Sequence, residues 1–377
     1  MVSFRSQRAP ATLIITLGAL LSTNAAPLEP IGLSECGRHF VKVDSQEPFV
    51  AWGFNYDHDD VDRLLEEYWH EEWDKVVEDF KAMKELGANT VRIHLQVEAF
   101  MKAPDRPNQS SLERLKRVVG LAEEIGLYLY VTGLGCYHRE DVPEWYDQLD
   151  ESDRWAVQAR FWKALAETCK GNPAVFAYDL MNEPILPGAE ESASDWLGDA
   201  FGDKHFVQRI TLDLAGRSRE EVAKAWVDTL VKAIRQKDTA TLTTVGVIPW
   251  VHVWPNATPL FYSEKVSENL DFVSVHFYPE QGEVERALTA LAAYDIGKPL
   301  VIAEMGPLKC GIDELEAFID GARPISDGYL GFYWGETYTP PHAEHVELIQ
   351  ALYRDWLDFF QRKTPEIVDL SDREGSK

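Results

Sequence analysis

The stretch Ala177-Tyr-Asp-Leu-Met-Asn-Glu-Pro184 is an apolar segment that stops at a carboxylate. Its length and composition predict a buried β-strand. Pro184 has no N–H to continue a ladder, so the strand ends just after Glu183. A second stretch, Pro299-Leu-Val-Ile-Ala-Glu304, is apolar and also ends in a glutamate. Three strand–helix repeats of about forty residues would separate the two glutamates, so both can face one barrel mouth.

Outward from these stretches, short apolar runs alternate with amphipathic runs. This alternation predicts a parallel sheet with helices outside. Eight units in this length favour a (β/α)₈ TIM barrel, a single α/β domain with inserted loops on the carboxyl-terminal face. A doubly wound open sheet is the alternative, weakened because no GxGxxG follows the first strand. The fifth helix, before Phe272, is poorly marked. We expect strands at 50–55, 89–94, 127–134, 175–182, 241–250, 272–277, 300–304 and 329–334, and helices at 70–86, 111–125, 152–170, 219–237, 283–294, 313–322 and 343–361.

The two ends of the chain differ from this pattern. Two arginines, an apolar run at 11–21 and small residues up to Ala26 are typical of an export signal cleaved near Ala25 or Ala26. A retained N-terminal anchor is the alternative. We therefore expect a secreted or periplasmic protein. The predicted parts are a signal peptide over 1–26, the barrel domain over 27–367 and a polar tail over 368–377.

The formal net charge of −26 limits the partners. A field of that sign repels nucleic acid, anionic membranes and polyanionic polysaccharides, whereas it tolerates a neutral ligand. Most of the excess is interpreted as a solvated acidic surface. No segment after the signal is apolar enough to cross a membrane, so we expect a soluble mature monomer with no membrane or nucleic-acid partner.

Four cysteines stand at wide, irregular spacing. In an exported protein they can pair in three ways, and the sequence does not choose among them. The lack of a CxxC makes a zinc site improbable on spacing alone. The four are Cys36, Cys136, Cys169 and Cys310.

Further polar and aromatic residues stand at the ends of predicted strands. Arg92 ends the second, His276 and Tyr278 end the sixth, and Trp334 ends the eighth. Active sites of barrels are built at this end of the strands. Together with Asn182-Glu183-Pro184 after the fourth strand and Glu-x-Gly after the seventh, this ordered set resembles glycoside hydrolase family five, the cellulase-type family of the retaining barrel clan. The resemblance spans about residues 31–362.

The resemblance implies a retaining O-glycoside hydrolase acting on β-linked neutral poly- or oligosaccharides such as a glucan or mannan, with no cofactor and no metal. Such hydrolysis uses two carboxyls about 5–5.5 Å apart. Glu183 would be the acid/base and Glu304 the nucleophile. Arg92 and Tyr278 would donate to Glu304, Asn182 would bind the sugar 2-hydroxyl, His276 would hold the acid/base or the sugar, and Trp334 would stack beneath the ring.

Each of these residues also has a purely structural interpretation. Arg92 can be an inner-barrel ion-pair partner, and His276 or Trp334 can be core residues. The two glutamates are harder to dismiss, because buried carboxylates are costly. The chain also departs from the family pattern: His94 replaces a proline, and the third strand runs into Tyr137 where many members carry histidine.

Two other functions remain open. One is a sugar-binding barrel that has lost catalysis, and the other is a metal-dependent hydrolase using Asp57-His58-Asp59-Asp60. The second would need paired histidines on later strands, which the sequence lacks, so an acidic loop is favoured. The long segment 184–216 is expected to wall the substrate cleft. Trp145, Trp250 and Trp254 are candidates for outer sugar contacts, and Glu280 and Glu336 for rim contacts.

Overall fold

Eight parallel strands close into a barrel in the computed structural model, which describes residues 27–188, 191–254, 256–332, 334–335 and 348–369. Each strand pairs with the next along the chain, and the last pairs with the first. The predicted (β/α)₈ barrel is therefore confirmed. The strands are β4 (Ala51–Tyr56), β5 (Thr90–Gln96), β8 (Tyr128–Gly135), β9 (Val175–Asn182), β12 (Leu242–Val247), β13 (Val273–His276), β14 (Leu300–Met305) and β15 (Gly328–Gly331).

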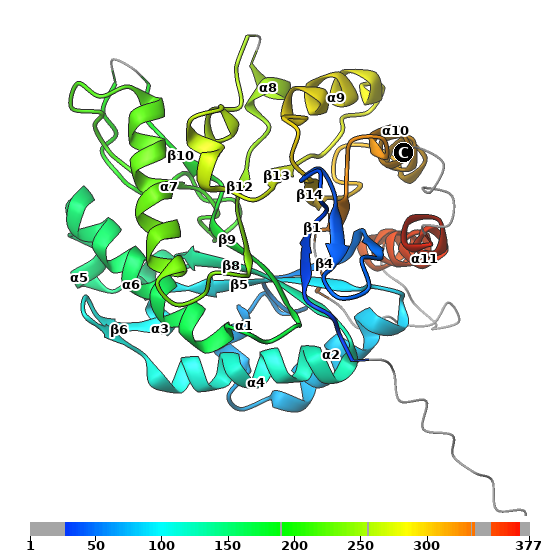
Figure 1. The fold of residues 1–377 in the computed structure, drawn as a ribbon, viewed down its shortest axis with the longest axis horizontal. Helices are drawn as coiled ribbons and strands as arrows, with labels where there is room; N and C mark the ends of the chain where they lie inside the picture. Colours follow the sequence, from blue (N-terminus) through cyan, green and yellow to red (C-terminus); the bar gives the residue numbers. More distant parts are fainter. Residues whose placement is uncertain (1–26, 189–190, 255, 333, 336–347, 370–377) are drawn as a thin grey trace, which may run out of the picture.

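Helices surround the strands (Figure 1). Sequence signals fix several of their ends. The Asp150 side chain caps α6 by accepting from the Asp153 N–H, and Ser218 forms a capping box with Glu221 at the start of α7. The longer helices are α2 (Trp73–Glu85), α4 (Gln109–Ile125), α6 (Glu151–Cys169), α7 (Arg219–Arg235), α9 (Val284–Leu291), α10 (Ile312–Ala322) and α11 (Leu348–Val368).

In its described residues the fifth unit has no long helix, which explains its weak sequence signal. Between β12 and β13 the chain forms the short helix α8 (Trp250–Val253) and two 3₁₀ turns, Leu260–Tyr262 and Val266–Asn269. The strand predicted to reach residue 250 ends at Val247, because Pro249 cannot donate to a ladder. The other short elements are α1 (Leu65–Tyr68), α3 (Val97–Phe100), β6 (Met101–Ala103), β7 (Arg106–Pro107), α5 (Glu144–Asp147), β10 (Pro184–Ile185), β11 (Gln208–Arg209), and 3₁₀ turns at Arg139–Asp141 and Ala292–Tyr294.

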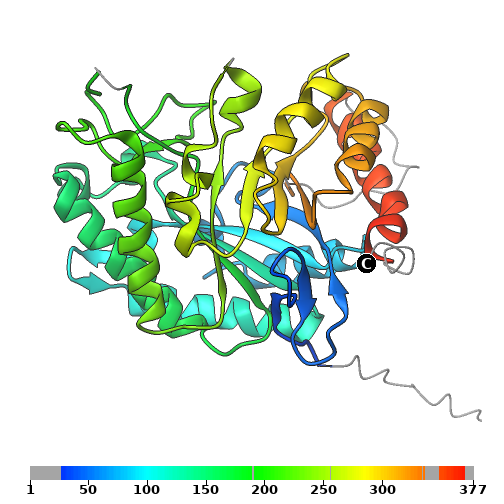
Figure 2. The ribbon, with the colours of Figure 1, turned by 45° about the horizontal axis from the view of Figure 1, so that its top comes forward.

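An apolar plug closes the amino-terminal end of the barrel. The small antiparallel sheet of β1 (Ile31–Leu33), β2 (Phe40–Lys42) and β3 (Pro48–Phe49) lies there, in dark blue in Figure 2. The Phe40 ring meets Phe176 at 5.0 Å and Phe272 at 5.2 Å, at the beginnings of β9 and β13. Such edge-to-face contacts favour tight packing. The small sheet does not cover the opposite, carboxyl-terminal end of the barrel, where polar side chains gather.

The strand β4 shows how the barrel separates its two faces. Trp52 and Phe54 point outward and pack on Phe360 of α11 at 4.3 and 4.0 Å between ring centroids. Asn55, between two outward aromatics, lies on the inner face and is fully buried. Successive side chains of a strand point to opposite faces. The inner face can therefore hold polar groups while the outer face holds the apolar core.

Several predictions concern the chain ends and the cysteines. The signal peptide over 1–26 lies outside the described residues, and so does the tail from 370 onward, while α11 runs to Val368. In the part of the chain that the structure describes, no helix is both long and apolar enough to cross a membrane. All four cysteines lie in that part and all are free, so none of the three pairings forms.

Candidate active site

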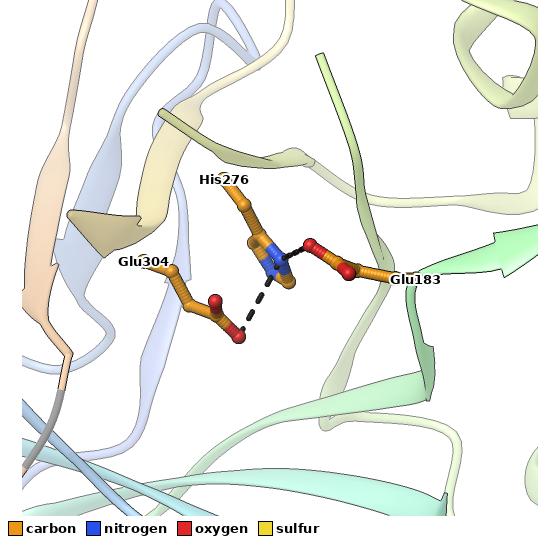
Figure 3. A group of neighbouring side chains, drawn as sticks. All are labelled: Glu183, His276 and Glu304. Carbon is orange, nitrogen blue, oxygen red and sulfur yellow. Dashed lines mark hydrogen bonds and ion pairs between the residues drawn. The ribbon is translucent and has the colours of Figure 1, made fainter. Parts of the chain in front are cut away.

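The two glutamates meet at the carboxyl-terminal mouth of the barrel. Glu183 follows β9, Glu304 belongs to β14, and His276 at the end of β13 lies between them (Figure 3). The facing carboxylate and imidazole atoms of these three residues lie within 4.8 Å of one another. His276 Nδ1 is 2.8 Å from Glu183 Oε1 and 3.4 Å from Glu304 Oε1. This proximity fits the short carboxyl separation of about 5–5.5 Å used in retaining glycoside hydrolysis.

Glu304 is surrounded by hydrogen-bond donors. Arg92 Nη1 donates to Oε1 at 2.7 Å, and the Tyr278 hydroxyl donates to Oε2 at 3.0 Å. Burial raises the pKa of Glu304, whereas the charge of Arg92 and its hydrogen bond oppose that rise. Donors of this kind stabilise the charged form of a carboxylate. The two donors therefore stabilise the ionised form of Glu304 against the effect of burial.

Among the described residues, the Glu183 carboxyl has a single hydrogen-bond partner. Its Oε1 shares a hydrogen bond with His276 Nδ1, and burial raises the pKa of Glu183 to about 7, with Arg92 acting weakly in the other direction. Burial also lowers the pKa of His276 to about 4, so the imidazole is neutral near pH 7. A neutral ring adds no full charge beside Glu183. This carboxyl can therefore hold a proton at neutral pH.

The backbone around Glu183 is unusual. Glu183 has a φ of 48°, in the left-handed region that side chains other than glycine rarely adopt. Its N–H donates to the carbonyl of Gly246 at 2.9 Å. A Cβ on Gly246 would lie 2.8 Å from His276 Nε2 and 3.0 Å from Arg92 Nη2. Only glycine at 246 lets β12 approach the site this closely.

Arg92 is held by a buried network that the sequence reasoning missed. Its Nη2 donates to Asp179 Oδ2 and Asn182 Oδ1, both at 2.8 Å, and its Nη1 donates to Asn55 Oδ1 at 2.7 Å. Asp179 also accepts from Thr132 and from the Gly246 N–H. A buried guanidinium needs such partners. A signal existed for both residues, since Asn55 and Asp179 each interrupt an apolar run within a strand sequence.

The departures from the family pattern pack against this network. His94 Nδ1 lies 2.6 Å from the Tyr137 hydroxyl, and His94 Nε2 lies 3.0 Å from Asn55 Oδ1. Burial and the charge of Arg92 lower the pKa of His94 well below its usual value. The neutral imidazole therefore links β5 to the end of β8, and Tyr137 fills the place where a histidine was expected.

The long segment after Glu183 is attached to the mouth at several points. Asn182 Nδ2 donates to the Phe206 carbonyl at 3.1 Å, and β10 pairs with β11. The Phe206 ring lies 4.8 Å from Tyr137. The buried Lys204 forms an ion pair with Asp62, from the loop after β4. These contacts place the segment along one wall of the mouth.

Trp334 is not at the mouth, contrary to the prediction. Its side chain is 1% exposed and packs edge-to-face on Phe54 at 5.5 Å, on the outer side of β4 beside Asp79. The reason is that β15 ends at Gly331, so strand alternation no longer fixes the direction of the residues that follow. Phe332 takes the inward place instead, with its ring 6.5 Å from Tyr278 and 6.2 Å from Phe206.

A cavity of about 290 Å³ opens beside Glu183. His276 and Tyr278 line it together with residues of α8 and α9, and Glu280 lies on its wall, as a rim residue should. Glu336, the other predicted rim residue, lies outside the described residues. Trp254 is 61% exposed, whereas Trp145 packs against the core.

The acidic residues of the loop after β4 form ion pairs with neighbouring basic side chains. Asp59 pairs with Arg63 at 2.7 Å and Asp60 with Lys75 at 2.8 Å, which accords with a structural acidic loop. Over the described ranges, the one cluster with metal-ligand spacing consists of Glu183, His276 and Glu304. There the Arg92 guanidinium already lies 2.7 Å from Glu304, and its positive charge opposes a second cation. The donor set does not fit a resident metal.

Fold and site together define a (β/α)₈ barrel with a paired-carboxylate centre of the glycoside hydrolase type. The model of the cellulase family, glycosyl hydrolase family 5, matches residues 48–337, and the chain belongs to this family. It is therefore a retaining hydrolase of β-linked carbohydrates of the glucan or mannan type.

Known proteins of this kind resemble the chain over most of its length. Mannan endo-1,4-beta-mannosidase A of Aspergillus aculeatus is 22% identical over 355 residues, which is 81% of this chain and 82% of that protein. The exo-β-1,4-mannosidase Op5Man5 from Opitutaceae bacterium strain TAV5 has a TM-score of 0.63 at 16% identity, over 90% of this chain but 62% of its own. The β-1,4-mannanase of the sea hare Aplysia kurodai has a TM-score of 0.60 at 15% identity, over 89% of this chain and 96% of its own. The structural likeness concerns the fold.

Proposed function

We propose that this protein cleaves the β-1,4 bonds of a mannan-type polysaccharide or its oligosaccharides, with Glu304 as nucleophile and Glu183 as acid/base. The observation that carries the proposal is the pair of carboxyls in unequal surroundings, with facing oxygen atoms within 4.8 Å of each other. Glu304 receives two strong donors, whereas Glu183 shares one hydrogen bond with a neutral imidazole. Double displacement needs this combination of one charged and one protonated carboxyl.

In the first step, a Glu304 oxygen attacks the anomeric carbon and the bond to the leaving oxygen breaks. Glu183 gives its proton to that oxygen, so the leaving sugar departs neutral. The electron pair of the broken bond stays on the leaving oxygen. Arg92 and Tyr278 hold the carboxylate in place for the attack and prevent its protonation.

In the second step, Glu183 acts as base. Forming the ester removes the negative charge of Glu304, and each of these two groups disfavours ionisation of the other. The pKa of Glu183 therefore falls once the ester has formed. Glu183 then takes a proton from water, the water oxygen attacks the anomeric carbon, and Glu304 leaves as a carboxylate.

Three other residues would bind the sugar or orient the acid/base. Asn182 is fixed by Arg92 and by the Phe206 carbonyl, and it would present its amide to the 2-hydroxyl of the sugar that is cleaved. His276 orients Glu183 through its Nδ1. Phe332 would supply the flat apolar face that we first assigned to Trp334, because its ring faces Tyr278.

The substrate proposal is supported by the relatives and by charge. One relative that aligns over most of both chains is a mannan endo-1,4-beta-mannosidase. A neutral mannan is compatible with a chain of net charge −26. With the sequence signal at 1–26, we propose that the enzyme is secreted and acts as a monomer on extracellular polysaccharide.

The test uses purified protein on β-1,4-mannan, β-1,4-glucan and their oligosaccharides, with the first products followed by NMR. We expect release of sugars from mannan, with the newly formed end appearing first as the β-anomer. Preference for glucan would correct the substrate only. Net inversion would contradict the double displacement, and an absence of cleavage on every β-glycoside would contradict the proposed function.

A further inference from the structure

The cavity beside Glu183 lies on one side of the catalytic pair. Glu183, His276 and Tyr278 border it, whereas Glu304 does not. Its remaining wall comes from the residues just after β12, from α8 and α9, and from the loops after β13 and β14. The cavity therefore adjoins the proposed acid/base and leads away from the proposed nucleophile.

The chemistry decides which sugar belongs there, on the basis of the proposed function. A nucleophile attacks the anomeric carbon from the face opposite the leaving oxygen. The acid must contact that leaving oxygen, so the leaving sugar lies on the Glu183 side. A volume of about 290 Å³ is at the lower end, near 300 Å³, of pockets that enclose small molecules, and it suits a single sugar ring.

His252 is the unexplained group in this cavity. Its side chain lines the wall, the residue is 9% exposed, and neither ring nitrogen has a hydrogen-bond partner among the residues that the structure describes. A buried polar group without a partner is costly unless something else completes its hydrogen bonds. Burial, followed by the charge of Arg286, lowers the pKa of His252, so the ring is neutral and offers one donor and one acceptor. A sugar hydroxyl can use both roles.

Two elements hold this imidazole in place. The His252 N–H donates to the Pro249 carbonyl at 2.8 Å within α8, and its carbonyl accepts from Arg286 Nη2 of α9 at 2.9 Å. The ring lies 5.6 Å from Phe277. A side chain fixed in this way is ready to bind without further ordering.

The charged residues on the cavity wall balance one another. Lys309 lies 3.4 Å from Glu280, and Arg286 lies 3.8 Å from Glu283. Because each cation has an acidic neighbour, the wall offers no net positive charge to an acidic sugar. The cavity therefore fits a neutral sugar that is recognised through its hydroxyl groups.

We propose that His252 is a specificity residue of the leaving-group site, where its two ring nitrogens hydrogen-bond the hydroxyls of the neutral sugar whose oxygen Glu183 protonates. The same contact would bind a sugar acceptor when the glycosyl-enzyme is intercepted by sugar instead of water.

The test compares two substrates that share the same sugar on the nucleophile side. One has a sugar leaving group, and the other has an aryl leaving group without hydroxyls. We expect His252→Leu to lower kcat/KM about tenfold on the first and less than twofold on the second, since only the first loses hydrogen bonds. His252→Phe keeps a ring against Phe277 but removes both ring nitrogens, so it should show the same losses as His252→Leu. His252→Gln, which offers both a donor and an acceptor, should recover part of the loss.

The controls separate this contact from a structural role. His70→Leu changes an exposed histidine that does not line the cavity and should alter neither substrate. Equal losses on both substrates, or no loss on either, would overturn the role of His252. If the wild-type protein cleaved neither substrate, that result would instead contradict the proposed function. Should His252→Leu fail to fold, His252→Phe and His252→Gln carry the comparison.

Discussion

Glu183 and Glu304 are the same residue type at the same barrel mouth, but their surroundings differ. Glu304 accepts from Arg92 at 2.7 Å and from Tyr278 at 3.0 Å, whereas Glu183 meets the neutral His276 at 2.8 Å and borders the open cavity. Burial raises the pKa of both carboxyls, so burial alone does not distinguish them. The donors do, and they indicate which carboxyl attacks and which one carries the proton.

The strongest way to break this comparison is to remove the attacking carboxylate. Glu304→Gly should lower the rate by about four orders of magnitude or more, because the first step loses its nucleophile. Azide should restore activity on an activated aryl glycoside and give the glycosyl azide of inverted configuration, read by NMR. A fluorosugar that labels a peptide lacking Glu304 would count against the assignment.

Removing the acid should give an azide product of the opposite configuration to that from Glu304→Gly. Glu183→Ala should cost about 10²- to 10⁴-fold on substrates with sugar leaving groups and far less on activated aryl glycosides, which leave without a proton. Azide then attacks the glycosyl-enzyme, so the product should keep its configuration. The same loss on every leaving group would show that Glu183 is not the acid.

The donors around Glu304 can be tested one at a time. Tyr278→Phe removes a donor that favours the ionised form, so the pKa of Glu304 rises and activity on the acidic side of the pH profile falls first. We expect about a hundredfold loss at low pH and a smaller one near neutrality. Tyr146→Phe, at a buried tyrosine that accepts from Gln158, is the control. An acidic limb that stays in place would refute the role of Tyr278.

The smallest effect concerns stability. The pKa of Glu183 in the folded protein, about 7, lies above its unfolded value, so folding stability falls as pH rises between those values. Glu183→Gln should therefore be more stable than the wild type by about 2–3 kcal/mol at pH 8 and nearly equal to it at pH 4. Glu304→Gln should gain less, because it removes one of the two carboxylates, Asp179 and Glu304, that pair with Arg92. The free energy of unfolding of each protein is measured with denaturant at both pH values. A difference between Glu183→Gln and the wild type that does not change with pH would contradict this account.

The fold followed from periodicity where the periodicity was strong. The strand over 175–182 and the helices α6 and α7 lie where the sequence predicted them, because apolar spacing and caps agree there. The prediction for the fifth unit was poor for a physical reason. The chain between β12 and β13 forms short helical turns, and such turns carry no amphipathic repeat. As a result, the strand predicted over 241–250 ran past the end of β12 to the first residue of α8, the short helix that holds His252.

The site was predictable only where a strand end fixed the residue. The structure brings Glu183, Glu304, Arg92, His276 and Tyr278 together with Asn182, as the sequence implied. The fully buried partners of Arg92 are set by which residues face one another across strands, and a linear sequence does not state that. Trp334 and Phe332 lie beyond the end of β15, where alternation gives no direction.

The left-handed backbone at Glu183 has a consequence for attempts to engineer this protein. An ordinary residue held at a φ of 48° costs about 1–2 kcal/mol, and glycine adopts the same conformation freely. The carboxyl at this position adds the cost of a buried charge at high pH. A selection for heat resistance alone would thus reward variants that replace this glutamate, and it would enrich robust proteins with no enzyme left in them. Libraries built on this scaffold need an activity screen at every round.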